Sequence, residues 1–142
     1  MKKTSIILGL ALTALGSQAM AADLKPGEWE IKRTITSEPA PPGMDKEATY
    51  TRCLTAKEAD NIERTTRQAS LRNGCESPEM DWDGDTLEWT TRCQAGERSL
   101  DSSGAMTLED DEHYTSRMTT RAQGEQPLTI EEEARWAGPC DS

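Results

Sequence analysis

The four cysteines, Cys53, Cys75, Cys93 and Cys140, are the side chains of this sequence with the widest chemical repertoire. A thiol can act as a nucleophile, bind zinc or form a disulfide. A nucleophilic thiol needs a general base beside it, and the sequence contains one histidine, His113. No two cysteines have the Cys-x-x-Cys spacing of a thiol oxidoreductase or a common zinc site. We therefore expect the cysteines to form two disulfides and none to be catalytic.

Four cysteines can pair in three ways, and their spacing does not decide among the three. We predict Cys53–Cys75, which would join the end of a strand to the far end of a helix, and Cys93–Cys140, which would join the C-terminal tail to the sheet. Through the entropy of loop closure, each bond would stabilise a small domain by roughly 3 to 4 kcal/mol.

Acidic side chains are a second group with possible chemistry, because calcium binds clustered carboxylates. Asp81, Asp83 and Asp85 alternate as in a calcium loop, but the required glycine and the final glutamate would fall at Thr86 and Arg92. The pattern therefore favours a polar hairpin turn.

Two further acidic runs occupy residues 109–112 and 131–133. The first precedes His113 and is typical of an acidic turn, since a lone histidine has no partner to complete a metal site. In the second run, Glu132 falls on the same strand face as Trp136. This run could mark the mouth of a cavity, or it could belong to a charged edge strand. A glycosidase needs two carboxylates at a set separation. The sequence contains 26 acidic residues, and it does not show which two of them would lie at that separation. We expect no catalytic residue, no metal ion and no cofactor.

Four tryptophans, Trp29, Trp82, Trp89 and Trp136, are the largest apolar side chains of the sequence. On a curved sheet they could surround a pocket for a small apolar ligand, or they could fill the core. We name them as the candidate ligand-binding residues, with the core as the alternative.

The elements that must position these residues are mostly strands, because polar and apolar residues alternate with a period of two along much of the chain. Segments rich in proline or in acidic residues separate the strands. Strands are predicted at residues 28–36, 48–54, 80–82, 87–93, 104–108, 113–122 and 128–136. Their short connections predict antiparallel neighbours.

One helix interrupts this series. Thr55 and Glu58 form a capping box, in which each side chain bonds to a free amide at the helix end. Together with the stop signal Asn73-Gly74, this box predicts a helix over residues 56–71. The fold class is therefore mainly β (α+β): an antiparallel curved sheet or small open barrel of six to seven strands, with one helix and two disulfides.

The N-terminus predicts export. The charged start Met1-Lys2-Lys3 precedes an apolar run at residues 6–15 and the small-residue site Ala19-Met20-Ala21. The apolar run is too short to span a bilayer, which takes roughly twenty residues. We expect residues 1–21 to be a cleaved secretory signal peptide and residues 22–142 to form a single disulfide-stapled domain, which is periplasmic or secreted.

The composition is acidic and poor in core residues: the formal net charge is −10, and the sequence contains no Val and no Phe. This charge argues against nucleic acid and anionic membrane surfaces as partners. Such a composition is typical of disorder, but small exported domains compensate for a thin core with disulfides. We therefore expect a folded monomer that does not insert into a membrane.

Five short segments mark the chain from its first strand to its end: Pro26-Gly27-Glu28-Trp29-Glu30, Arg52-Cys53-Leu54-Thr55, Trp89-Thr90-Thr91-Arg92-Cys93, Gly104-Ala105-Met106-Thr107 and Gly138-Pro139-Cys140. In this order they resemble the domain-of-unknown-function family 3617, which comprises small exported proteins of Gram-negative bacteria. The resemblance implies an antiparallel sheet with one helix and a periplasmic location. It supplies no catalytic or binding residue.

These observations leave three functions, in order of preference. The first is a non-enzymatic binding module for a small apolar ligand or an envelope component. The second is an acidic interaction factor, for example an inhibitor of a basic cell-wall hydrolase. The third is a purely structural envelope factor, and an enzyme is not expected.

Overall fold

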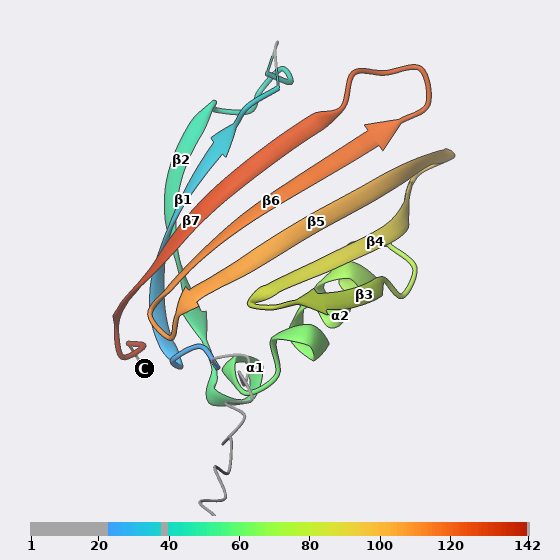
Figure 1. Ribbon diagram of the computed structural model, residues 1–142. Coiled ribbons are helices and arrows are strands. Elements are labelled where there is room, and N and C mark those ends of the chain that lie inside the picture. The colour runs from blue at the N-terminus through green and yellow to red at the C-terminus, as the bar shows by residue number, and fades with distance from the viewer. Residues whose placement is uncertain (1–22, 38–39, 142) are drawn as a thin grey trace, which may run out of the picture.

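A computed structural model describes residues 23–37 and 40–141 and shows one seven-stranded antiparallel sheet (Figure 1). The strands lie in the order β2-β1-β7-β6-β5-β4-β3. The elements are β1 (Gly27–Ile35), β2 (Glu47–Leu54), α1 (Ala56–Ala59), α2 (Ile62–Arg72), β3 (Glu79–Asp83), β4 (Thr86–Ala95), β5 (Arg98–Asp110), β6 (His113–Ala122) and β7 (Leu128–Gly138).

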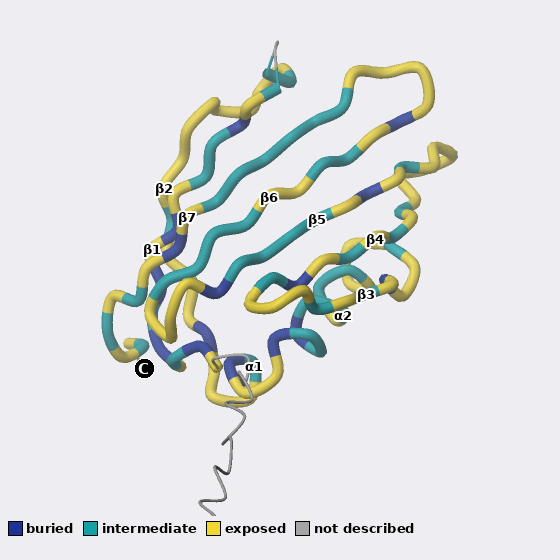
Figure 2. Tube along the Cα trace, viewed as in Figure 1, coloured by how far each residue is buried: buried dark blue, intermediate teal, exposed yellow. Residues whose placement is uncertain are grey.

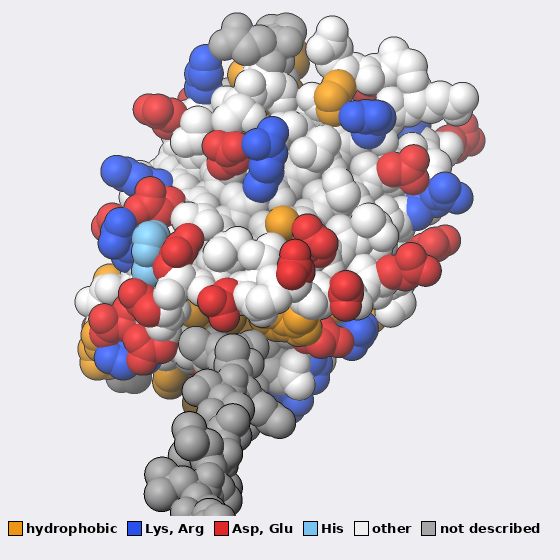
Figure 3. All heavy atoms as spheres, in the orientation of Figure 1, with side chains coloured by type: hydrophobic (Ala, Val, Ile, Leu, Met, Phe, Trp, Pro, Cys, Tyr) orange, Lys and Arg blue, Asp and Glu red, His pale blue; other side chains and the backbone are white. Residues whose placement is uncertain are grey.

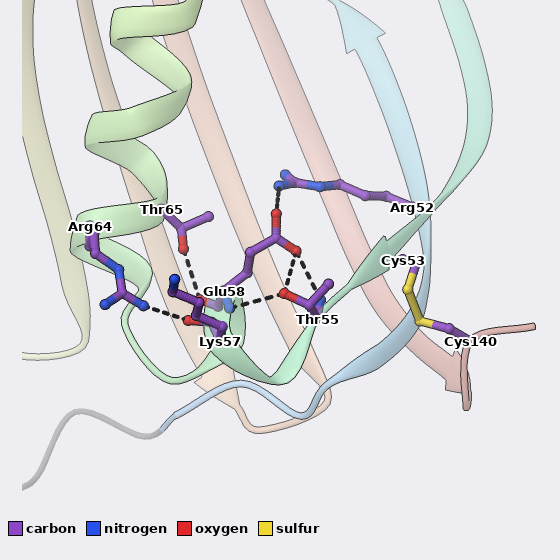
Figure 4. A network of polar contacts seen from close by, with 8 residues as sticks. All are labelled: Arg52, Cys53, Thr55, Lys57, Glu58, Arg64, Thr65 and Cys140. Atoms are coloured by element: carbon purple, nitrogen blue, oxygen red, sulfur yellow. Dashed lines mark hydrogen bonds and ion pairs between the residues drawn. A yellow bond between two sulfur atoms is a disulfide. The ribbon is translucent and has the colours of Figure 1, made fainter. Parts of the chain in front are cut away.

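The sheet is open and curved. Strands β2 and β3 are its two edges. Figures 1 and 4 show that α2 lies across one face of the sheet, which we call the inner face. The predicted curved antiparallel sheet is confirmed, with seven strands and without closure into a barrel.

The predicted single helix is two helices, α1 and α2, with a break at Asp60 and Asn61. The Asn61 side chain accepts a hydrogen bond from the backbone N–H of Arg64 at 2.9 Å, and so it caps a new helix. The Asn61 backbone, with φ −147° and ψ 85°, lies outside the helical region. Each helix therefore begins at its own cap.

Strand β5 begins at Arg98 rather than at the predicted residue 104. Its first half is polar and lacks the alternation of a half-buried strand, yet it pairs with β4 as far as the Arg98–Ala95 pair. The tight turn between the two strands contains Gly96, whose φ of +65° suits a residue without a side chain. Ser102 is buried in this part of the sheet and shares a hydrogen bond with a threonine of β6.

The core lies on the inner face, against the helices. Its buried members are Leu24, Trp29, Ile31, Leu54, Ala59, Ile62, Leu87, Leu108 and Ala134. Figure 2 shows that most buried stretches gather at the end of the sheet near α1. The few buried apolar residues are therefore concentrated at one end of the molecule.

Gly104 in β5 makes room for the ring of Trp89. The two residues are paired across β5 and β4, and a Cβ on Gly104 would lie 2.2 Å from Trp89 Cζ2. Real Cβ atoms do not approach another carbon so closely. The indole can therefore lie across β5 only because residue 104 has no side chain.

The first disulfide joins Cys53, near the end of β2, to Cys140 in the C-terminal tail. Strand β1 lies between β2 and β7, and its residue Glu28 pairs with both Cys53 and Gly138. The register therefore brings the two cysteines together although they are 87 residues apart in sequence.

The second disulfide joins Cys75, just after α2, to Cys93 in β4, and the same two residues form an isolated β-bridge. The predicted pairing of Cys53 with Cys75 and of Cys93 with Cys140 is therefore wrong. That prediction placed the end of the helix near β2. The helix instead ends against β4, which lies next to the edge of the sheet opposite β2. The prediction of two disulfides is confirmed.

The disulfides also bear on the compartment, because they form and persist in oxidising environments outside the cytoplasm. Within the part of the chain that the structure describes, no helix is long and apolar enough to cross a membrane. The predicted signal peptide, residues 1–21, lies outside the described residues. The cleavage site and the single domain over residues 22–142 stay predictions.

Candidate ligand-binding cavity

Helix α2 crosses the inner face and is tied to the rest of the molecule at both ends. At its C-terminal end, Cys75 forms the disulfide with Cys93 of β4. Next to it, the backbone N–H of Glu76 donates to the carbonyl of Arg92 in β4 at 2.8 Å. These bonds hold the end of the helix against β4.

At its N-terminal end, α2 is tied to β2 through α1 (Figure 4). The Glu58 carboxylate accepts from the backbone N–H of Thr55 at 2.8 Å, and the Thr55 hydroxyl accepts from the Glu58 N–H at 3.2 Å. The other carboxylate oxygen of Glu58 lies 3.7 Å from the Arg52 guanidinium in β2. In α2, the Thr65 hydroxyl donates to the Glu58 carbonyl at 2.9 Å. Glu58 therefore joins β2, α1 and α2, and the Thr55 N–H lowers the pKa of its carboxyl.

A helix anchored at its ends leaves space beneath its middle. A cavity of about 180 Å³ lies between the sheet and the first turns of α2, and one of about 300 Å³ lies between the sheet and its last turns. Thr66, Ala69, Trp89 and Met118 line both. The two spaces are therefore neighbouring compartments of one region, which we call the inner cavity.

The walls of the first compartment are largely apolar. They include Trp29, Ile31, Met106, Tyr114, Met118 and Ile130 from the sheet and Ile62 and Ala69 from α2. The Trp29 ring is held in place, because its indole N–H donates to the Lys25 carbonyl at 3.0 Å and its centroid lies 5.3 Å from that of Tyr114. The cavity therefore has a rigid aromatic wall.

A polar cluster of three side chains, Arg33, Tyr50 and Glu132, spans the adjacent strands β2, β1 and β7, and Arg33 and Glu132 line the first compartment. Arg33 Nη2 donates to the Tyr50 hydroxyl at 3.0 Å and to Glu132 Oε2 at 3.3 Å. The Tyr50 hydroxyl donates to the same Oε2. Arg33 also lies over the Tyr50 ring, 5.0 Å from its centroid. Its Nε is buried and has no hydrogen-bond partner among the described residues.

The two tyrosines beside the cavity stay protonated at physiological pH. Burial raises the pKa of Tyr50 to about 12, and the bond to Glu132 adds to the shift. Burial likewise raises the pKa of Tyr114 to about 12, with a smaller contribution from the charge of Glu132. The Tyr114 phenol, which lines the first compartment, can donate a hydrogen bond to a ligand, whereas the one O–H of Tyr50 already donates to Glu132. Both phenols are poor sources of a base near neutral pH.

Residues 24–140 match the family DUF3617, whose description is "Protein of unknown function". The chain belongs to this family. The match includes every strand, both helices and the four cysteines, and it confirms the resemblance predicted from the sequence. No curated protein and no solved structure matches the chain. Because the description names no activity, the function of this DUF3617 protein has to be argued from its own residues.

Two of the four tryptophans predicted as ligand-binding residues line the inner cavity of this DUF3617 protein, namely Trp29 and Trp89. Trp82 packs against the core, and its indole N–H donates to a glutamate of α2 at 3.3 Å. Trp136 also packs against the core, and its indole N–H donates to the carbonyl of Pro26 at 3.1 Å. The structure therefore brings one pair together at the cavity and places the other pair elsewhere, and the role of all four in binding stays a prediction.

The aspartates at 81, 83 and 85, the acidic run at residues 109–112 and His113 line neither compartment of the cavity in the DUF3617 chain. Asp83 ends β3 and Thr86 begins β4, so Asp81 and Asp83 precede the predicted hairpin turn and Asp85 lies in it. The acidic run at residues 109–112 likewise lies at the β5–β6 turn. His113 Nε2 lies 3.6 Å from the Glu133 carboxylate. Within residues 23–37 and 40–141, no group of three or more His, Cys, Asp or Glu residues could hold a metal ion.

The outer face of the sheet differs from the inner face in character. Figure 3 shows acidic and basic side chains interspersed over this side. Arg117 and Glu131, for example, form an ion pair of 3.2 Å across β6 and β7. Exposed pairs of this kind contribute at most about 1 kcal/mol each. The apolar cavity with a charged cluster is therefore a feature of the inner face.

The sequence carries a partial signal for the polar cluster. Alternation predicts that Glu132 faces inward, and β7 is an interior strand rather than a charged edge. Alternation also places Arg33 on the face of Trp29 and Ile31, which could have been noticed as a charge at an inward position. Tyr50 offers no such signal, because only the register of β2 against β1 places it beside Arg33.

Proposed function

We propose that this protein is an exported, non-enzymatic binding protein of the periplasm that holds one small apolar ligand in the inner cavity. The observation that carries the proposal is the apolar space between the sheet and a helix that is anchored at both ends. A pocket that already exists before the ligand arrives avoids much of the entropy cost of ordering its walls on binding.

The walls favour an apolar ligand, because each methylene group moved from water into such a site contributes about 0.8 kcal/mol. The larger compartment, of about 300 Å³, lies at the lower end of the range of roughly 300–1,000 Å³ that is usual for ligand pockets. The ligand is therefore small, of the size of one short acyl chain or a ring system rather than of a whole diacyl lipid.

The residue types at the cavity support binding rather than catalysis. The cysteines form disulfides, and Tyr50 and Tyr114 remain protonated. His113 lies outside both compartments. The groups that would touch a ligand are hydrogen-bond donors, one paired carboxylate and apolar walls. Export to the periplasm is supported by the disulfides, by the N-terminal sequence and by the family resemblance.

Filling the cavity tests the proposal. The fluorescent apolar probe N-phenyl-1-naphthylamine should bind the mature protein saturably and fluoresce more strongly. Ala69→Trp should abolish this binding, because Ala69 lines both compartments. Gln68→Trp is the matched control, since Gln68 is the exposed neighbour on the same helix and lines neither compartment. Thermal unfolding of both variants shows whether they are folded.

Native mass spectrometry of protein purified from the periplasm gives a second readout. A bound small molecule that is present in the Gln68→Trp protein and absent from the Ala69→Trp protein would support the proposal. If the folded wild-type protein bound neither the probe nor a copurified molecule, the proposal would be wrong.

A further inference from the structure

We infer that the ligand of the inner cavity is an amphiphile whose apolar body ends in an anionic group, and that Arg33 and Arg52 bind this group. The inference rests on the proposed function, because it concerns the ligand of the same cavity. It adds a ligand class that the apolar walls alone do not specify.

The charge of the cavity lining is opposite to that of the chain. Arg33 of β1 and Arg52 of β2 line the first compartment, and Glu132 is the one acidic residue among the described residues that line it. The lining of the second compartment contains no charged residue within the described ranges. The full chain has a formal net charge of −10. The lining of the first compartment, with two arginines and one carboxylate, therefore carries a net positive charge in a chain that is negative.

Both arginines keep donor capacity for a ligand. An arginine side chain carries five N–H donors and no acceptor. The described partners of Arg33, Tyr50 and Glu132, both bond to its Nη2, while its Nε is buried and unpartnered among the described residues. Arg52 Nη2 lies 3.7 Å from Glu58, which is too long for a hydrogen bond and leaves only an ionic contact.

An unpartnered donor selects for an acceptor. Leaving a donor without a partner in a buried site is unfavourable, and a ligand oxygen that bonds to it removes that cost. Bonds from a guanidinium to an anionic oxygen are about twice as strong as neutral ones. Glu132 and Tyr50 hold the guanidinium of Arg33 through Nη2, so its Nη1, which is bonded to neither, remains for the ligand. An ammonium group would instead be repelled by Arg33 and Arg52.

The apolar body of the ligand has a matching place. From the arginines, the first compartment continues to Trp89 and Met118, which also line the second compartment. The second compartment adds apolar contacts such as Leu100 and has no charge that an apolar chain would have to desolvate. A head group at the arginines and a chain beneath α2 therefore fit the polarity of the whole cavity.

Three ligands with the same chain and different head groups test the inference: decanoate, 1-decanol and decylammonium, each used below its micelle concentration. Each would displace N-phenyl-1-naphthylamine from the wild-type protein. Decanoate should bind at least about tenfold more tightly than decanol, which corresponds to about 1.4 kcal/mol. Decylammonium should bind more weakly than decanol.

Variants assign the preference to the cluster. Arg33→Met should reduce the preference for decanoate over decanol to the part that Arg52 contributes, while the probe still binds. Lys32→Met is the matched control, because it removes the same charge from the adjacent, exposed position of β1. Glu132→Gln should tighten decanoate binding, since it removes the competing carboxylate, whereas damage to the fold would weaken binding. If Arg33→Met does not fold, Arg33→Lys, which keeps the charge but lacks Nη1, should reduce the preference.

The outcomes separate this inference from the proposed function. If the probe binds but decanoate and decanol compete equally, or decylammonium competes best, the anionic ligand class is wrong and the cavity function stands. If Lys32→Met reduces the preference as much as Arg33→Met, the assignment to Arg33 is wrong. If the probe and all three ligands fail to bind the folded wild-type protein, both the proposed function and this inference fail.

Discussion

Removing each disulfide in turn tests the strand register and the anchoring of α2 together. The variant Cys53→Ser/Cys140→Ser opens a loop with a sequence separation of 87, whereas Cys75→Ser/Cys93→Ser opens one with a separation of 18. The entropy of loop closure grows with the logarithm of loop length, which gives stabilisation of about 4.6 and about 3.2 kcal/mol at room temperature. Loss of the first bond should therefore lower the free energy of unfolding by about 1.4 kcal/mol more than loss of the second.

Ligand binding should show the opposite order. The Cys75–Cys93 bond holds the C-terminal end of α2 against β4, beside the second compartment, so its loss should weaken binding of N-phenyl-1-naphthylamine. The Cys53–Cys140 bond lies outside both compartments, so its loss should leave binding nearly unchanged at temperatures where the variant is folded. The cysteines are exposed or half-buried, which limits any packing defect caused by serine.

Urea unfolding followed by tryptophan fluorescence measures the stabilities, and probe titration measures binding. Peptide mapping without reduction should recover Cys53 linked to Cys140 and Cys75 linked to Cys93. A peptide that links Cys53 to Cys75 would refute the pairing. If the Cys75→Ser/Cys93→Ser protein bound the probe as tightly as wild type while the Cys53→Ser/Cys140→Ser protein did not, the role of the second disulfide in forming the cavity would be refuted.

Three further predictions concern packing and protonation. Gly104→Ala should destabilise the fold by about 1–3 kcal/mol in urea unfolding, because its Cβ would lie 2.2 Å from Trp89; wild-type stability would contradict this contact. Glu58→Gln should cost stability at neutral pH but not in acid, because the folded-state pKa of Glu58 lies below 4.5. The contribution of the carboxylate to stability is lost as the pH falls through that lowered pKa. An equal cost at both pH values would argue against a stabilising role of the Glu58 charge. In an ultraviolet titration, Tyr50 and Tyr114 should ionise at about 12 rather than near 10.0, and stability should fall as the pH rises over that interval; ionisation near 10.0 in folded protein would show that neither phenol is buried.

Strands with a regular alternation and clear turn residues were predictable from local sequence. Strand β6 has the predicted bounds, His113–Ala122, because acidic and Gly-containing turns stand on either side of it. The start of β5 was not predictable in this way. Its polar first half becomes a strand through hydrogen bonds to β4, and pairing satisfies a backbone whatever the polarity of its side chains.

The helical region was likewise predictable only in part. The capping box of Thr55 and Glu58 was predictable, because its two partners are three residues apart. The break at Asn61 was missed, since an asparagine can stand within a helix or cap a new one. The break ends α1 after one turn and starts α2, the helix that lies over the cavity.

The candidate site was predictable only in part. Trp29 and Trp89 were singled out as large apolar side chains, and both line the cavity. Trp82 and Trp136 have the same chemistry, but their strand positions lead them to other contacts. A residue type indicates what a side chain can do, whereas its neighbours across the sheet decide where it does so.

The sequence by itself determined the alternating strands, the capped helix, the use of cysteines as disulfides and the family, because each depends on residue types and on spacings of a few positions. Only the tertiary structure decided which cysteines pair and which charges meet on the inner face. Cys53 reaches Cys140 because β1 lies between β2 and β7, and the same arrangement places Arg33 beside Glu132. The physical reason is that register and strand order bring together residues far apart in sequence, and no local pattern records those distances.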